Sequence, residues 1–199
     1  MNSFDTKKEY ILENDRVKLR PLAVSDFDHL LPYSMDEPEL WEYSLVPANG
    51  EENLRNYIQK ALTDRLSNTA YPFIVFDKET STYAGSTRFY DIQNYHQTTQ
   101  LGFTWYGKNY QGTGLNKNCK LLLLDFAFDI MNMQRVEFRA DNKNVKSIAA
   151  MKSIGCTKEG VLRSNCNGLT GRRDSIVLSI LKSEWENELR SNLKVKLGR

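Results

Sequence analysis

The segment 107–130 has the residue pattern with the clearest chemical meaning in this chain. It consists of a glycine-containing turn, Gly107-Lys-Asn-Tyr-Gln-Gly-Thr-Gly114, followed by a strongly apolar stretch with the character of a helix, 115–130. A Gly-x-Gly turn at the start of a helix leaves several backbone N–H groups unpaired and aimed at one point. The helix dipole adds about half a positive charge there. This pattern predicts a site for an anion such as a phosphate group.

The charges along the same stretch support this prediction. Lys117 and Lys120 fall in the first two turns of the predicted helix, whereas Asp125 and Asp129 fall toward its end. This order opposes the helix dipole, and each misplaced charge costs from a few tenths to about 1 kcal/mol. Residues 92–124 also contain no Asp or Glu. A bound anion at the turn would account for both features.

Two common phosphate-binding motifs are excluded by the spacing. A P-loop needs a second glycine five residues after the first and then Lys-Ser/Thr, but here Lys117 and Asn118 follow Gly112 at these positions. A Rossmann fingerprint needs its third glycine where Lys117 stands, and an acidic residue about 20 residues further on at the end of a strand. Neither is present. The remaining alternative to an anion site is a plain tight loop.

Composition sets the broad class. With 199 residues and 40% hydrophobic side chains, the chain is expected to form one domain, 1–199, with a full core. Its 27 basic and 25 acidic residues are interspersed and give a net charge of +2, which does not favour nucleic-acid binding. No apolar run approaches 18 residues, so we expect no membrane contact and a cytoplasmic location.

Metal and histidine chemistry are not expected. Cys119, Cys156 and Cys166 are an odd number without a Cys-x-x-Cys pair, which is typical of reduced thiols. His29 and His96 are the two histidines, one in a predicted helix and one in a polar loop, and we interpret both as surface residues. We therefore predict no metal site.

Helices and strands are expected to alternate along the chain. Helical periodicity and capping residues predict helices at 25–34, 36–43, 51–66, 115–131, 144–154 and from 183 onward. Alternating or β-branched stretches predict strands at 17–21, 71–77, 83–90, 101–106, 134–141, 156–165 and 172–181. The last two strands form a hairpin around 167–171. We predict an α/β protein without internal repeats.

At this point the sequence resembles a known family, the GNAT-type N-acetyltransferases, and within it the RimJ/RimL-like branch that acetylates protein N-terminal amines. The likeness covers nearly the whole chain, and its pieces keep the family's order and spacing. These pieces are Arg16-Val-Lys-Leu-Arg-Pro-Leu22, Gly85-Ser-Thr-Arg88, Gln111-Gly-Thr-Gly-Leu-Asn116, Asn144-x-x-Ser147, Ile154-Gly155, Glu159-Gly-Val-Leu-Arg163, Gly171-Arg-Arg-Asp174 and Ser183-Glu-Trp185. The resemblance implies a single GNAT-like domain of the α+β type, with a mostly antiparallel mixed sheet splayed in the middle and helices on both faces.

The resemblance also implies the co-substrate, acetyl-CoA, and the residues that hold it. The pyrophosphate would bind the turn residues Gln111, Gly112, Thr113, Gly114, Leu115 and Asn116, with Lys117 beside them. The pantetheine arm would pair with the backbone of Thr104, Trp105 and Tyr106, where an N–H would polarise the thioester carbonyl. Asn144 would hydrogen-bond the pantetheine, cap the following helix, or do both. Asn116 departs from the family's Gly or Ala at the end of the turn.

The implied reaction is direct attack of a neutral amine on the thioester. Many members use a Tyr to protonate the leaving thiolate, but Met151 stands at that position here. Ser147 matches the alternative donor of the RimJ/RimL-like branch, the other interpretation being a serine that packs inside. The base stays open, because Gln100 and Cys166 replace carboxylates that the family uses. Asp174, which we favour, Asp91, Glu137, Glu159 and a water relay are the candidates.

The resemblance implies an amine acceptor, either a protein N-terminal amine, such as that of a ribosomal protein, or a small amine, and the sequence leaves this choice open. The acceptor would enter opposite the CoA, near the helices 25–34 and 51–66 and the loop 91–97, with the aromatic residues Tyr33, Trp41, Tyr43, Tyr90 and Tyr95 on that side. The last hairpin and the C-terminal helix could support a homodimer. Two other hypotheses remain: an acyl-CoA-binding regulatory module without catalysis, and an unrelated α/β protein that binds ATP or NAD.

Overall fold

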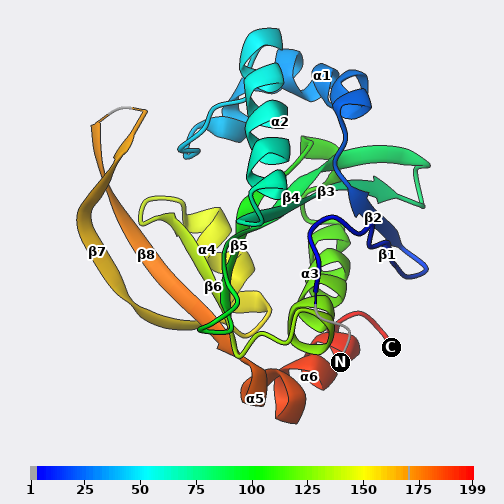
Figure 1. Cartoon of the computed structure of the whole chain (residues 1–199), viewed down its shortest axis with the longest axis vertical. Helices are drawn as coiled ribbons and strands as arrows, with labels where there is room; N and C mark the ends of the chain where they lie inside the picture. The colour runs from blue at the N-terminus through cyan, green and yellow to red at the C-terminus, as the bar shows by residue number, and fades with distance from the viewer. Residues whose placement is uncertain (1–3, 170) are drawn as a thin grey trace.

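A mixed sheet of eight strands forms the centre of the computed structural model, which describes residues 4–169 and 171–199 (Figure 1). The strand order is β1-β2-β3-β4-β5-β6-β8-β7. Neighbouring strands are antiparallel throughout, except that β5 and β6 run parallel. The expected α/β fold with a mostly antiparallel mixed sheet is confirmed.

The elements have the following bounds. The strands are β1 (Leu12–Glu13), β2 (Val17–Pro21), β3 (Ala70–Asp77), β4 (Thr82–Gln93), β5 (Thr98–Tyr106), β6 (Arg135–Asp141), β7 (Thr157–Gly168) and β8 (Gly171–Leu181). The helices are α1 (Phe27–Asp36), α2 (Glu51–Leu66), α3 (Leu115–Asp125), α4 (Val145–Ser153), α5 (Lys182–Glu184) and α6 (Arg190–Lys196). A π-helical turn, Phe126–Ile130, extends α3, and another, Trp185–Leu189, joins α5 to α6.

Helices cover both faces of the sheet, as expected. Leu54, Tyr57 and Trp41 form one apolar cluster with residues of α1, α2 and strands β3 and β5. The larger cluster on the other face joins α3, α4 and α6 to the sheet. Alternation along β6 shows the division, since Val136 and Phe138 are buried in the larger cluster while Glu137, between them, points to the other face.

Three sequence expectations need correction. Strand β5 begins at Thr98, not at 101, because Thr98–Gln100 pair with β6, a long-range partner that local pattern does not reveal. The helix expected over 115–131 keeps α geometry only to Asp125. The helix expected at 36–43 is a 3-10 turn, Pro38–Trp41. The hairpin turn expected at 167–171 includes residue 170, which lies outside the described residues.

Gly85 lets the end of β5 come very close to β4. It pairs with Tyr106, has a φ of 155°, and a Cβ added to it would lie 2.1 Å from the Trp105 carbonyl oxygen. That atom is backbone and cannot move aside without shifting the strand. Gly85 therefore fixes the position of the last residues of β5.

We expect Gly85→Ala to lower the free energy of unfolding by about 1–3 kcal/mol, because the methyl group forces β5 away from β4. Urea unfolding followed by circular dichroism measures the change. Gly160→Ala is the matched control: Gly160 lies in β7, a Cβ there meets no atom within 4 Å, and the expected change is below about 0.5 kcal/mol. Equal stability of the two variants would contradict this account.

Candidate active site

Strands β5 and β6 separate at the centre of the sheet. They pair only at Thr98–Gln100 with Arg135–Glu137, whereas β5 stays paired with β4 up to Tyr106. Beyond Gln100 the β6-facing edge of β5 therefore has no strand beside it. Phe103 has a φ of 48°, and the register with β4 shifts between Ser86 and Arg88, so β5 bulges along this edge. The predicted splay is present.

The glycine turn lies directly after the separated end of β5. Gly112 and Gly114 have φ values of 77° and 86°, which favour glycine, and a Cβ on either would meet no atom within 4 Å. The first helical hydrogen bond runs from the Asn118 N–H to the Gly114 carbonyl at 3.2 Å, so the N–H groups before it have no partner within the helix. The turn is an open cradle of backbone donors at the N-terminus of α3.

Side chains in and around the turn stabilise it. The Gln111 side-chain amide donates to the Tyr106 carbonyl at 3.0 Å, and the Thr113 hydroxyl donates to the Tyr110 carbonyl at 2.9 Å. Asn116 has a buried side-chain oxygen without a hydrogen-bond partner among the described residues. Such an orphaned acceptor at a binding turn suits an N–H or O–H donor of a ligand. Leu115 is buried, which anchors α3 to the core.

The predicted pantetheine-binding residues offer their backbone here, because their side chains are occupied. Trp105 packs on Trp41 on the α1–α2 face, with ring centroids 5.2 Å apart. Tyr106 is buried on the opposite face next to Cys119. The Thr104 hydroxyl lies 2.7 Å from that of Thr87. These contacts fix β5 and leave the backbone groups of its unpaired edge free to hydrogen-bond with a ligand.

The charges of α3 are placed differently from the sequence expectation. Asp125 does not need a bound anion to explain it, because it accepts from Arg190 Nε at 2.6 Å and from Trp185 Nε1 at 3.0 Å. Asp129 also pairs with Arg190. Lys117 is half-buried in the first turn, near the cradle, but Lys120 is buried against the sheet. Of the two lysines, only Lys117 lies beside the glycine turn.

Asn144 and Ser147 lie together where β6 ends. The Asn144 side-chain oxygen caps α4 by accepting from the Ser147 N–H at 3.0 Å. This contact leaves the Asn144 amide NH₂ for a ligand. Asp174 is close to the same turn, since its carbonyl accepts from the Asn142 N–H at 2.9 Å. The structure thus brings the backbone of Asp174, 30 positions further along the chain than Asn144, next to the turn that carries Asn144 and Ser147.

The candidate bases have different surroundings. Arg135 holds the Glu159 carboxylate, and this pair lowers the pKa of Glu159 to about 2. Glu137 is bound by both Arg135 and Arg139. Glu159 is therefore a poor base near neutral pH, and both oxygens of Glu137 are held in ion pairs.

Two carboxylates are less constrained. Asp91 accepts from the Gln100 amide at 2.9 Å and from the Gln93 amide at 2.7 Å. Asp174 is exposed and accepts from the Ser164 N–H at 2.7 Å through one oxygen.

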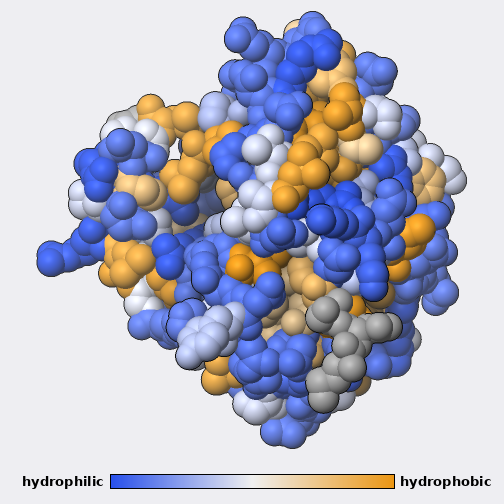
Figure 2. Space-filling view, in the orientation of Figure 1, coloured by the Kyte–Doolittle hydropathy of each residue, from blue (hydrophilic) through white to orange (hydrophobic). Residues whose placement is uncertain are grey.

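The face opposite α3 has mixed polarity. Tyr90 covers Gly102 and packs on Phe103, and burial raises its pKa to about 12. Arg173, which is buried on β8, donates to the Tyr43 carbonyl at 3.2 Å and so connects the hairpin to the loop after α1. Figure 2 shows an indentation of the surface between this hairpin and the α1–α2 end of the molecule. Of the other predicted aromatics, Trp41 is core and Tyr95 is 93% exposed.

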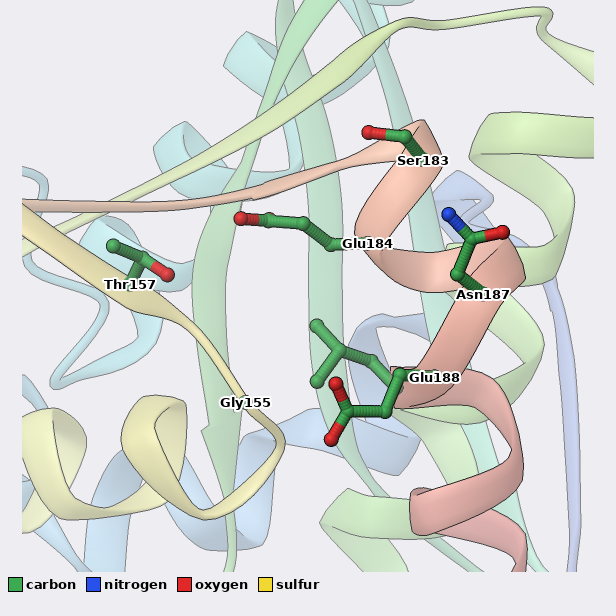
Figure 3. Close-up of a pocket in the computed structure, with 7 residues that line it drawn as sticks. Gly155, Thr157, Ser183, Glu184, Asn187 and Glu188 are labelled. Carbon is green, nitrogen blue, oxygen red and sulfur yellow. The ribbon is translucent and has the colours of Figure 1, made fainter.

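A hollow of about 390 Å³ lies elsewhere, between the end of α4 and the C-terminal helices (Figure 3). Gly155, Thr157, Ser183 and Glu188 are among its lining residues. It is at the end of the sheet where β6 begins, whereas the glycine turn and Asn144 follow the ends of β5 and β6. The hollow is therefore separate from the site described above.

Within the described residues, no group of three or more His, Cys, Asp or Glu side chains could hold a metal ion. The same part of the chain contains no helix with the length and apolar character to cross a membrane. The site combines an anion cradle, an unpaired strand edge beside it, and polar side chains where the next strand ends, an arrangement that suits an extended ligand with an anionic end.

Known proteins are similar to this chain in sequence and in fold. N-acetyltransferase p20 of Bacillus licheniformis, which is uncharacterized, is 29% identical over 175 residues, covering 87% of this chain and 97% of that protein. YdaF of Bacillus subtilis, provisionally named a ribosomal N-acetyltransferase, is 29% identical over 106 residues, or 52% of this chain and 56% of its own length.

A solved structure is similar to this chain in fold. The microcin C7 self-immunity acetyltransferase MccE, solved in complex with acetyl-CoA and AMP, superposes with a TM-score of 0.76 at 23% identity, covering 84% of this chain and 93% of that one. The family model described as an acetyltransferase (GNAT) domain matches residues 16–157. The chain therefore belongs to the GNAT family of acetyl-CoA-dependent acetyltransferases.

Proposed function

We propose that residues 1–199 form one catalytic domain that transfers an acetyl group from acetyl-CoA to a primary amine by direct attack in a ternary complex. The observation that supports this most is the unpaired edge of β5 beyond Gln100, leading straight into the open cradle at Gly112 and Gly114. A pantetheine arm can add to that edge as a strand would, while its pyrophosphate meets the N-terminus of α3. We place this activity in the cytoplasm.

Each predicted site residue has a role in this proposal. Backbone N–H groups of 112–116 and the Lys117 ammonium bind the pyrophosphate, while Gln111 positions the turn through its bonds to the Lys108 and Tyr106 carbonyls. The backbone of 104–106 binds the pantetheine and polarises the carbonyl. Asn144 donates its amide to the pantetheine. Ser147, one turn along α4, protonates the sulfur as CoA leaves.

Asp174 is our candidate for the group that receives the ammonium proton, through water. Glu137 and Glu159 are neutralised by arginines, and Asp91 accepts from two glutamine amides. Asp174 bonds one backbone N–H through one of its two oxygens and lies beside the Asn142–Asn144 turn. A weak base is sufficient for this step, because an α-amine has a pKa near 8 and is partly neutral at pH 7.

The acceptor is proposed to enter from the face that carries Tyr90, where the surface is indented between the hairpin and the α1–α2 end. A protein N-terminal amine, such as that of a ribosomal protein, is the acceptor that the partial likeness to YdaF favours. A small amine is the alternative.

Ligand binding tests the co-substrate. Acetyl-CoA at a hundred times its Kd should raise the free energy of unfolding by about 2.7 kcal/mol, which a thermal melt detects as a shift of several degrees. CoA should act similarly, whereas ATP and NAD should have little effect. Stabilisation by ATP or NAD without stabilisation by CoA species would instead support a nucleotide-binding protein.

Asn144 can be tested separately for its cap and for its amide. Asn144→Ala should cost about 1 kcal/mol of stability because α4 loses its N-cap, whereas Asn144→Ser should keep the cap. Both variants should bind acetyl-CoA several-fold more weakly in calorimetry, since both lose the amide donor. Wild-type affinity in Asn144→Ser would limit Asn144 to its capping role.

Ser147→Ala separates an enzyme from a CoA-binding module. With peptide amines as acceptors and free thiol as the readout, kcat should fall about 10²-fold or more while the Kd for acetyl-CoA stays the same. Ser153→Ala, on the same helix, is the control and should keep wild-type kcat. If the wild-type protein binds acetyl-CoA but releases no thiol with any peptide or small amine, the regulatory-module hypothesis is favoured.

A further inference from the structure

Lys120 has a position that the anion turn does not explain. It lies on the side of α3 that packs against the sheet and is only 5% exposed. Its ammonium donates to the Thr104 hydroxyl of β5 at 3.2 Å and lies 5.8 Å from the ring centroid of Phe138 on β6. Thr104 and Phe138 both come after the last residues at which β5 and β6 pair with each other. Lys120 therefore reaches the space between the two separated strands.

The charge of Lys120 has no opposite charge beside it among the described residues. The titratable groups that face it are the thiols of Cys119 and Cys156, and burial raises the pKa of each to about 12, so both stay neutral. Burial in turn lowers the pKa of the Lys120 ammonium to about 8. An unpaired buried charge lowers stability, and Met or Leu of similar size would fill the same space without this penalty. Packing alone therefore does not explain a positive charge at this position.

The proposed path of acetyl-CoA passes this ammonium. The pantetheine lies along the edge of β5 that includes Thr104, and its thioester end lies between β5 and β6. Met151, which stands where many family members have the tyrosine that serves the leaving sulfur, belongs to the same apolar cluster as Cys156 and Phe138. In the proposed position of the sulfur, Met151 thus offers no hydroxyl, whereas Lys120 offers a positive charge.

We propose that the Lys120 ammonium is the positive charge that stabilises the CoA sulfur as the thioester bond breaks. This inference rests on the proposed function. As the amine nitrogen bonds to the carbonyl carbon, the C–S bond breaks and its electron pair passes to sulfur, which becomes a thiolate. Lys120 interacts more strongly with that thiolate than with the neutral thioester, so it lowers the barrier without losing a proton. The nitrogen loses one proton as the amide forms, and Ser147 passes a proton to the thiolate, which gives free CoA.

The pKa of the CoA thiol in its binary complex tests this directly and needs no acceptor. Thiolate absorbance during a pH titration should show the bound thiol about one to three pH units more acidic than free CoA in the wild-type protein. In Lys120→Met the bound thiol should lose most of that shift, and Lys120→Gln should behave in the same way. Lys152→Met, which removes an exposed lysine of α4, should leave the shift unchanged.

Kinetics and stability complete the test. Lys120→Met should reduce kcat about 10²-fold with an unchanged KM for acetyl-CoA, and it should melt at or above the wild-type temperature. The ratio of wild-type kcat to Lys120→Met kcat should also fall as pH rises through about 8, because the ammonium then loses its charge, whereas the neutral fraction of the acceptor amine changes alike in both proteins. A merely structural lysine predicts the opposite pattern: lower stability with unchanged kcat and thiol pKa.

The two levels of inference can fail separately. If the wild-type protein does not bind CoA, the proposed function is wrong. If it binds CoA but the bound thiol has the pKa of free CoA, or if Lys120→Met keeps the full shift and kcat, the function stands and the role of Lys120 is overturned.

Discussion

Beyond Gln100, strand β5 keeps its hydrogen bonds to β4 and has none to β6, and the candidate active site depends on this separation. Unpaired strand edges inside a protein are costly, so something must stabilise β5 in its position. Gly85 allows a close approach of the two backbones that a side chain would prevent, and Trp105 is packed on Trp41. The edge is thereby fixed before a ligand arrives, which lowers the entropy that binding must overcome.

The glycine turn and the separated strands form a single continuous binding surface. The turn follows β5 directly, so the direction in which β5 ends decides where the cradle at Gly112 and Gly114 lies. The Gln111 side chain, which donates to the Tyr106 carbonyl, ties the two together. A ligand with an anion at one end and an arm of amide groups at the other can bind the turn and the strand edge at the same time. A nucleotide without such an arm would leave the strand edge unpaired.

Local and distant interactions explain what the sequence could predict. The turn, the α4 cap at Asn144 and the alternation in β6 depend on neighbouring residues, and all three were predicted correctly. The start of β5 at Thr98 and the pairing of Asp125 with Arg190 depend on residues more than 30 positions away, and the sequence reasoning missed both. Lys120 could have been found, because Leu124 and Ala127 follow it at helical spacing on one apolar face. The positions of the candidate catalytic residues relative to a bound ligand remain predictions.

The proposed reaction does not need a strong base, because the amine and the thioester sulfur make different chemical demands on the site. On the acceptor side, a partly neutral amine needs only a weak base or water, which agrees with Gln100 standing where a carboxylate is common. On the thioester side of the proposed reaction, a thiolate forms inside the protein, where water solvates it poorly. A fixed charge is most effective there, and Lys120 lies in that low-dielectric space between the strands. In the role that we propose for Lys120, the stability lost by burying this ammonium is the cost of faster departure of CoA.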